Sequence, residues 1–283
     1  MYERVATPSK IECIMKKVKV DCELRYVASD SSDFVFNIQA AQTAWQDIFE
    51  EKITFNQDAQ ATFGLGHTGQ NRLLRVSNVF GEFNIHYQAT VNVKYPEPSG
   101  YENEMRIGEL PLEIIPYTWP SRYCESDQIT QLASDLFGAV PQGYLRVLAI
   151  CDWIHRNIEY QVGVTNSTTS SLQVLDGGVG VCRDFAHLGI SFCRALNIPA
   201  RFVTGYAFFD EPPSDFHAIF EVYLGYRWIL FDATRMSPVN QLVRIATGRD
   251  ASDTAFSTIF GSVVMNYMNP DVEVVEPHQS IYL

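Results

Sequence analysis

The 283-residue sequence lacks a long apolar segment of any kind. Its first twenty residues, MYERVATPSKIECIMKKVKV, contain no apolar core of the roughly 7–15 residues that a secretory signal peptide needs. No later run approaches the roughly 18 apolar residues that span a bilayer. We therefore expect a soluble, cytoplasmic protein with no membrane partner.

Positive charge is also scarce. The 21 Lys and Arg residues stand against 33 Asp and Glu, which gives a formal net charge of −12 at pH 7. No basic block, alone or interleaved with aromatic residues, offsets this balance. Because such a chain repels phosphate backbones, we expect no nucleic-acid partner.

Paired cysteine motifs are missing as well. None of the six cysteines forms a Cys-x-x-Cys pair, which is the strongest sequence sign of a structural zinc site, and no segment has the spaced oxygen ligands of a calcium loop. We expect no metal and no other cofactor. Without an export signal the thiols should stay reduced, so that one is available for chemistry. The six are Cys13, Cys22, Cys124, Cys151, Cys182 and Cys193.

The N-terminal part of the sequence is rich in strand patterns. Between residues 15 and 95, alternating and β-branched runs such as VKVDCELRYV and FNIHYQATVNVKY are separated by polar turn clusters. The segment PEPSGYENE, at residues 96–104, combines proline, glycine and polar residues and indicates a boundary. We predict an antiparallel β domain over residues 1–100, in which residues 1–14 are an extension if the methionine that follows is the native start, and a second domain over residues 101–283.

Helical periodicity follows the boundary. An apolar face with helical spacing begins behind Ser126, which we expect to cap a helix that ends near Phe137. A second periodic run between Val147 and Ile158 predicts another helix, whose buried face includes Trp153. These helices should pack on the second domain's sheet.

Cys182 lies at the start of a third predicted helix. The glycines of DGGVGVC permit a tight turn, and the apolar spacing from Phe185 to Leu196 predicts a helix that Pro199 ends. A helix N-terminus presents unpaired backbone N–H groups and a partial positive charge, both of which favour a thiolate. The same N–H groups are candidate donors to an oxyanion.

A hairpin supplies partners for this thiol. If two strands pair symmetrically about the turn Gly225-Tyr226, His217 and Asp232 share one face as diagonal neighbours, about 7–8 Å apart between Cα atoms. An imidazole and a carboxylate can bridge that distance, and a bulge would break the relation. The three expected strands of this region are ARFVTGYAFF, DFHAIFEVYL and RWILFD.

Cys182, His217 and Asp232 form the set that nucleophilic acyl transfer requires: a thiolate that attacks a carbonyl, an imidazole that moves the proton and a carboxylate that orients the imidazole. The segments that contain them, GVCRDFAHLGISFCRALNIPARFVTGY and DFHAIFEVYLGYRWILFDAT, resemble the core of bacterial transglutaminase-like proteins. The resemblance extends over roughly residues 105–260.

This resemblance implies an α+β fold related to papain-like proteases, with a catalytic helix packed on an antiparallel sheet and an N-terminal β region before it. It identifies Cys182, His217 and Asp232 with the family's catalytic Cys, His and Asp, and it implies that RIATGRDASDTAF packs near the core. Family members include protein cross-linkers, peptidases, amidases and proteins that have lost activity.

Each of the three residues also has an ordinary structural interpretation. Cys182 could be a buried apolar thiol, His217 a satisfied strand histidine and Asp232 a turn residue, and together they could ligate zinc. We prefer the catalytic interpretation because the glycine turn, the helix start and the shared face coincide. We expect structural roles for His187, Asp184, Trp153, Trp228 and Cys193, and a structural or substrate-positioning role for Arg183.

The sequence thus predicts a cysteine-dependent acyl-transfer enzyme that acts on amide bonds of peptides or proteins through a thioester at Cys182. Hydrolysis is the preferred outcome over cross-linking, because a cross-linking site must exclude water while admitting an amine. The alternative is a non-catalytic module that binds a peptide or protein in the groove between the β domain and the core.

Overall fold

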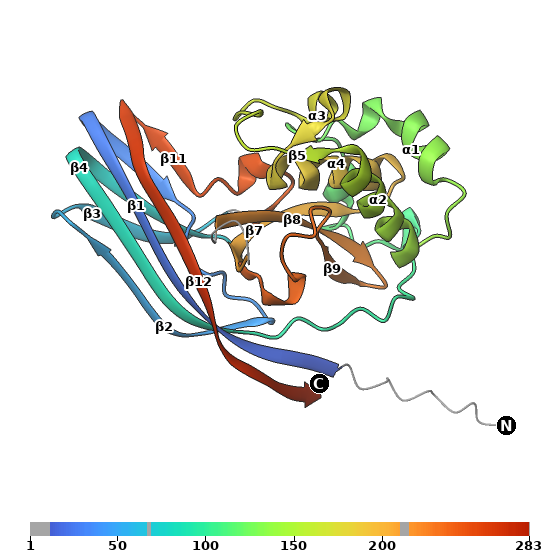
Figure 1. The fold of residues 1–283 in the computed structure, drawn as a ribbon, viewed down its shortest axis with the longest axis horizontal. Helices are drawn as coiled ribbons and strands as arrows, with labels where there is room; N and C mark the ends of the chain where they lie inside the picture. The colour runs from blue at the N-terminus through green and yellow to red at the C-terminus, as the bar shows by residue number, and fades with distance from the viewer. Residues whose placement is uncertain (1–11, 67–68, 210–214, 283) are drawn as a thin grey trace.

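The computed structural model describes residues 12–66, 69–209 and 215–282. Figure 1 shows a large sheet of long strands on one side and a smaller sheet, covered by helices, on the other. This is the predicted α+β architecture. Residues 1–11 of the predicted extension lie outside the described residues, whereas residues 12–14 already belong to the first strand.

The large sheet contains the predicted N-terminal strands. β1 (Glu12–Phe36), β2 (Gln46–Phe55), β3 (Gln60–Leu65) and β4 (Arg72–Val93) pair in antiparallel fashion, with β4 between β1 on one side and β2 and β3 on the other. Alternate side chains of β1 and β4 point into a buried apolar core, as the alternating sequence pattern predicts. The antiparallel β region is therefore confirmed.

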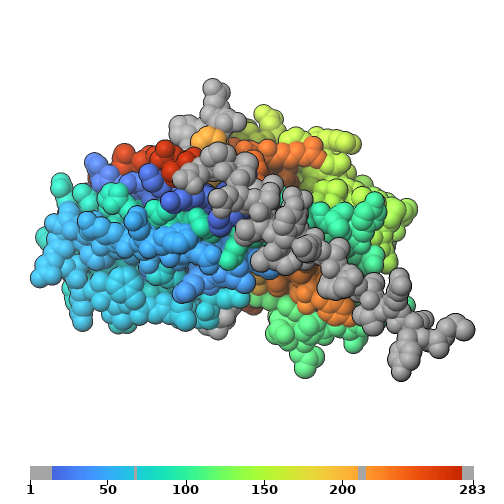
Figure 2. All heavy atoms as spheres, turned by 90° about the horizontal axis from the view of Figure 1, so that it is seen from below, coloured from blue at the N-terminus to red at the C-terminus, as the bar shows by residue number. Residues whose placement is uncertain are grey.

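The C-terminal part of the chain differs from our predicted division. β11 (Ser257–Phe260) and β12 (Val263–Tyr282) both pair with β1 of the large sheet, although we assigned them to the domain spanning residues 101–283. In Figure 2 the red C-terminal strand lies against the blue N-terminal one. The physical reason is that β1 would otherwise expose a long hydrogen-bonding edge, which β12 covers.

Four α-helices lie on one side of the smaller sheet (Figure 1). They are α1 (Thr130–Phe137), α2 (Tyr144–Asn157), α3 (Ser171–Gly177) and α4 (Cys182–Ala195). α1 is shorter than predicted, because Ser126 begins a separate 3-10 turn and α1 starts after Ile129 without a side-chain cap. α2 buries its predicted apolar face. The 3-10 turns are η1 (Ile107–Glu109), η2 (Ile115–Thr118), η3 (Ser126–Gln128), η4 (Val239–Gln241) and η5 (Ala251–Asp253).

The smaller sheet has the strand order β10-β7-β8-β9, antiparallel throughout. β8 and β9 pair symmetrically from Leu224 opposite Arg227 to Phe220 opposite Phe231, without a bulge. Gly225 and Tyr226 both have positive φ, 54° and 64°, the backbone of a two-residue hairpin turn. The predicted register is confirmed. The strands are β7 (Ala200–Ala207), β8 (Asp215–Leu224), β9 (Arg227–Phe231) and β10 (Val243–Gly248).

Packing fixes α4 against this sheet. At Gly189 an added Cβ would lie 2.7 Å from the Phe220 ring, so glycine is what permits the close approach of α4 to β8. The buried side chains of α2 and α4 and one face of β7 and β8 form one continuous cluster. The opposite side of the sheet meets the large sheet, where Tyr206 and Val243 pack with its buried residues.

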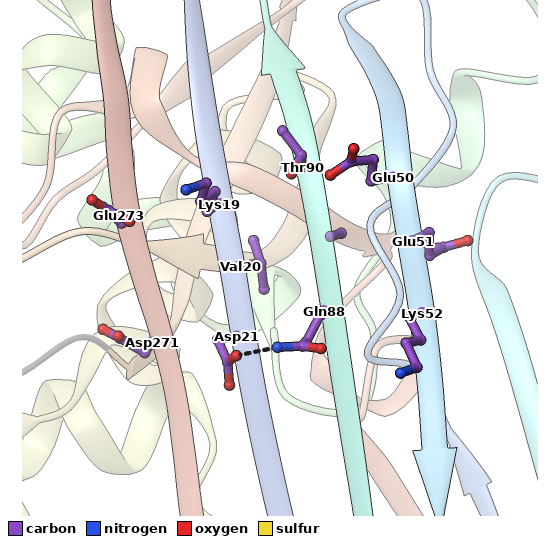
Figure 3. A pocket seen from close by; sticks show the side chains of 11 residues that line it. Lys19, Val20, Asp21, Glu50, Glu51, Lys52, Gln88, Thr90, Asp271 and Glu273 are labelled. Atoms are coloured by element: carbon purple, nitrogen blue, oxygen red, sulfur yellow. Dashed lines mark hydrogen bonds between the residues drawn. The ribbon is translucent and has the colours of Figure 1, made fainter.

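One part of the outer face of the large sheet is polar. Figure 3 shows side chains of β12, β1, β4 and β2 around a shallow hollow of about 560 Å³. Gln88 donates a hydrogen bond to Asp21 (2.7 Å), and Lys19 and Lys52 lie among carboxylates. Within the described ranges no three His, Cys, Asp or Glu side chains are grouped so as to hold a metal ion. No helix in the described part of the chain is long and apolar enough to cross a bilayer.

Candidate active site

Cys182 is the first residue of α4, as predicted. Gly178 ends α3 in the left-handed conformation (φ 67°), which turns the chain sharply toward α4. Gly180 must also lack a side chain, because a Cβ there would lie 2.9 Å from Cβ of Asp184. Among the cysteines whose side chains are described, Cys182 alone is not fully buried.

Asp184 fixes this helix start from inside. Its buried carboxylate accepts hydrogen bonds from the Val181 N–H (3.0 Å) and the Thr165 hydroxyl (2.6 Å). Arg183 donates to the same carboxylate (2.8 Å) and to the Asn166 carbonyl (2.7 Å). Through these contacts Asp184 and Arg183 hold the backbone of Cys182 in place.

His217 and Asp232 meet as the hairpin register requires. The His217 Nε2 atom lies 2.9 Å from Asp232 Oδ2, and both side chains are almost completely buried. The other oxygen of Asp232 accepts from the Thr234 N–H (2.8 Å) and hydroxyl (2.7 Å), which fixes the carboxylate orientation. The Phe209 ring meets the imidazole edge-on at 5.1 Å. Because Nε2 bonds to Asp232, Nδ1 is the nitrogen left to face Cys182.

The electrostatics couple all three side chains. Burial alone would lower the pKa of His217, but hydrogen bonds to Asp232 and Cys182, and the negative charge of both, raise it to about 10. Burial works to raise the pKa of Asp232, yet the His217 imidazolium and the Thr234 donors bring it below its ordinary value. The arrangement therefore favours a protonated imidazole at His217 beside an ionised Asp232.

Tyr160 is a site residue that the sequence analysis missed. Its hydroxyl is close enough to Cys182 for the thiol and the backbone N–H of that residue to influence its pKa. Burial raises the pKa of Tyr160, and the negative charge of Cys182 adds to the rise. The cause is a short parallel pairing of β5 (Glu159–Tyr160) with β6 (Val179–Gly180). Two strands of two residues each are too short to produce a periodic pattern in the sequence, so the sequence could not predict this contact.

The other residues that we assigned to structure are buried or half-buried in packing. Burial lowers the pKa of His187 to about 3, and its neutral ring accepts from the Ala251 N–H (3.1 Å) and stacks on Tyr123. Burial raises the pKa of Cys193 well above its usual range. Trp153 and Trp228 each pack edge-on against other aromatic rings.

A cavity of about 350 Å³ opens beside Cys182 and His217. Its walls come from α4, β7, β8, β10 and the segment that leads through η5 into β11. That last segment connects the smaller sheet to the large one (Figure 1). The Cys182 side chain thus borders a half-open cavity.

This fold and site define a class: a cysteine-dependent enzyme with a transglutaminase-like core behind an N-terminal β domain. Residues 130–233 match the family described as "Transglutaminase-like superfamily", and residues 15–112 match "Bacterial transglutaminase, N-terminal domain". The chain belongs to the transglutaminase-like superfamily.

Similar proteins agree with this assignment. A solved structure of a candidate cysteine protease from Cytophaga hutchinsonii is 40% identical, covers 95% of this chain and 93% of its own, and superimposes with a TM-score of 0.90. An uncharacterised protein of Mycobacterium leprae is 30% identical over 119 residues, and one of Mycobacterium bovis is 30% identical over 135 residues. Those matches cover 38% and 43% of this chain and 42% of each mycobacterial protein.

Proposed function

We propose that the protein hydrolyses amide bonds in peptides or proteins through a thioester at Cys182, with His217 as the acid and base and Asp232 as the residue that orients it. The observation that carries the proposal is His217, which interacts with the thiol on one side and with the carboxylate on the other. This is the relation that nucleophilic acyl transfer needs.

The chemical steps follow from these positions. The Cys182 thiolate attacks the carbonyl carbon, and the oxygen that gains charge is stabilised by hydrogen bonds from the Cys182 N–H and the Tyr160 hydroxyl, both of which lie beside the thiol. The His217 imidazolium gives its proton to the leaving amine as the C–N bond breaks. His217, now neutral, takes a proton from water, which attacks the thioester and releases a carboxylic acid and the thiol.

We prefer hydrolysis to transamidation because water is always available, whereas transamidation needs a site that excludes water while it admits an amine. A glutamine-containing peptide distinguishes the two reactions: a cleaved backbone indicates hydrolysis, whereas ammonia release with incorporation of an added amine indicates transamidation. The cytoplasm stays our prediction for the compartment, since the mechanism needs a reduced thiol.

The proposal is tested by trapping the acyl-enzyme. Wild-type protein and Cys182→Ala are incubated with peptide extracts, and the mass of the active-site peptide is measured. We expect an acyl adduct on Cys182 in the wild type alone, and faster labelling of Cys182 than of buried Cys193 by a thiol reagent. The non-catalytic binding module would be favoured by a different set of results. In that case both thiols would be labelled equally fast, no acyl adduct would form, and Cys182→Ala would still bind peptide.

A further inference from the structure

The half-open cavity at the nucleophile is walled mainly by apolar side chains. Phe216 and Phe256, whose ring centroids stack 4.8 Å apart, line it together with the buried side chains of Phe202, Ala218 and Ile245. It differs in this respect from the hollow on the large sheet, where carboxylates and lysines line the wall (Figure 3). The cavity therefore offers a ligand close packing and removal of apolar surface from water.

Few polar groups reach the surface of this cavity. Thr204, Thr254 and Ser257 line it, but their hydroxyl oxygens are buried and so add almost no polar surface. The Tyr123 hydroxyl already donates a hydrogen bond to the Ser167 carbonyl (2.7 Å). The wall therefore has little to offer a hydrogen-bonding group of a ligand.

The charged side chains of the cavity already have partners. The described lining residues include no acid, and the two cationic ones, Arg183 and His217, lie 2.8 and 2.9 Å from the carboxylates of Asp184 and Asp232. A ligand amine would find no counter-ion here, and a ligand carboxylate would have to compete with a carboxylate of the protein. Because burial of an unpaired charge is costly, the cavity disfavours charged groups of either sign.

The position of the cavity decides which part of a substrate can enter it. Cys182 and His217 both contribute to its wall, so a side chain that fills it lies next to the reacting atoms. When an amide bond of a peptide reaches the Cys182 thiol, the residues on either side of that bond are the ones near enough to occupy the cavity. The wall therefore contacts a substrate residue that adjoins the bond to be cleaved.

We propose that this cavity is a specificity pocket for a large, uncharged apolar side chain of a residue that adjoins the cleaved amide bond. Leucine, isoleucine, methionine and phenylalanine form this class, since burial of their side chains is favourable and needs no polar partner. A cavity of about 350 Å³ has room for one such side chain. The inference rests on the proposed function, because it assumes that an amide of the bound peptide reaches Cys182.

N-substituted chloroacetamides test the pocket without assuming a direction of peptide binding. The probes carry a methyl, isopentyl, 2-phenylethyl, aminobutyl or carboxypropyl group on nitrogen, and mass spectrometry times the alkylation of Cys182. Each rate is divided by that of the same probe with 2-mercaptoethanol, which removes differences in intrinsic reactivity. We expect the isopentyl and phenylethyl probes to react at least about tenfold faster than both charged probes. A charged probe that reacts as fast as the apolar ones would overturn the proposal.

Two variants assign the effect to this cavity. Ala255→Phe adds bulk at an exposed lining position, and Phe256→Ala removes one of the stacked rings. In both, the advantage of the apolar probes should fall at least about threefold, while the methyl probe stays within about twofold of its wild-type rate. Ala139→Phe adds the same bulk at an exposed position outside the cavity and should leave the advantage intact. An advantage that persists in both cavity variants, at unaltered melting temperatures, would overturn the pocket assignment.

Sequencing of the peptides that the enzyme cleaves in an extract extends the test to substrates. Leucine, isoleucine, methionine and phenylalanine should be enriched on one side of the cleaved bonds, and the enriched side identifies the residue that enters the cavity. Cleavage without enrichment on either side would overturn the pocket and leave the mechanism standing. If iodoacetamide labels Cys182 no faster than Cys193 and no peptide is cleaved, the proposed function itself is contradicted.

Discussion

At the scale of single residues, the site depends on groups that hold the reacting atoms in place. Asp184 fixes the helix start that presents Cys182, and Thr234 fixes the carboxylate that presents His217. Neither residue needs to touch a substrate. The geometry around the thiol is therefore set before a substrate arrives, which reduces the reorganisation needed during reaction.

Asp232 should control the pH range of activity. Its carboxylate helps to raise the pKa of His217 to about 10, so the imidazolium persists in alkaline solution and is lost only as the pH rises through that value. In Asp232→Asn we expect kcat/KM to fall by roughly 10²–10⁴ and its alkaline limb to move to lower pH. A pH–rate profile measures both, with exposed Asp135→Asn as the control. An unmoved alkaline limb would contradict the assignment.

Tyr160 should stabilise the charged oxygen formed during attack. In Tyr160→Phe the ring contact with Phe185 remains, while the hydroxyl close to Cys182 is lost. We expect kcat for amide cleavage to fall about 10- to 100-fold. Iodoacetamide alkylation, which forms no oxyanion, should stay within about twofold of wild type. Equal losses in both reactions would point to a disturbed thiol instead.

The sequence was sufficient for the positions of Cys182, His217 and Asp232, because a helix start and a two-residue turn obey local rules. It was insufficient for Tyr160, which reaches the thiol through a pairing of two-residue strands. It was also insufficient for the cavity. Phe256 comes from a segment whose place against β8 depends on tertiary packing, and such packing has no periodicity to be found in the chain.

At the scale of elements, a buried ion network joins β7, β8 and β10. Glu221 on β8 accepts from Arg201 Nε on β7 (2.7 Å) and from the Arg244 guanidinium on β10. Arg201 also lies over the Trp228 ring of β9, 4.1 Å from its centroid. The hairpin that presents His217 is thus tied by charge to β7, with which it also pairs, and to β10, which lies on the other side of β7.

Glu221 should make stability sensitive to acid. Burial would raise its pKa, but Arg201 and Arg244 lower it below the ordinary carboxyl value. The ionised Glu221 carboxylate therefore stabilises the fold at pH values above its pKa in the unfolded chain. This stabilisation is lost as the pH falls through the lower pKa that Glu221 has in the folded protein. We expect Glu221→Gln to lower the free energy of unfolding by about 3–5 kcal/mol at pH 7. In this variant the free energy of unfolding should also fall less steeply as the solution is made acidic.

Urea denaturation at pH 7 and in mild acid measures this effect. Glu23→Gln is the matched control, because Glu23 forms an exposed ion pair with Arg25 on β1, and exposed pairs contribute little. Equal destabilisation by the two variants would contradict a special role for the buried network.

The hairpin and α4 were predictable as elements because their patterns are local. The placement of β12 was not. Its sequence predicts a strand, yet which sheet it joins is decided by the unpaired edge of β1, far away in the chain. α1 shows the same limit on a smaller scale, since its start is set by the turn at Ser126–Gln128 and not by the apolar spacing.

At the scale of the whole molecule, the two sheets share buried surface and should not fold apart. Tyr206 of β7 donates to the Ile38 carbonyl (2.6 Å), and Val243 and Ile245 of β10 pack in the core of the large sheet. Removal of residues 257–283 would uncover the edge of β1 and the buried Val272 position. We expect the shortened chain to aggregate and to lose cooperative unfolding.

Size-exclusion chromatography and thermal circular dichroism test this expectation. The control removes residue 283 alone, which lies beyond β12. A shortened chain that elutes as a monomer and melts within a few degrees of wild type would show that the large sheet tolerates an open edge.

The pairing of β1 with β12 also sets an order of events in synthesis. β1 leaves the ribosome long before β12 has been synthesised. Its outer edge therefore stays unpaired while the rest of the chain is made. Such distant pairing raises the contact order and slows folding. Phe256 and Ser257, which line the cavity at Cys182, directly precede and begin the strand that joins this edge. Cys182 therefore acquires this wall of its cavity only after β11 and β12 have been synthesised and have joined β1.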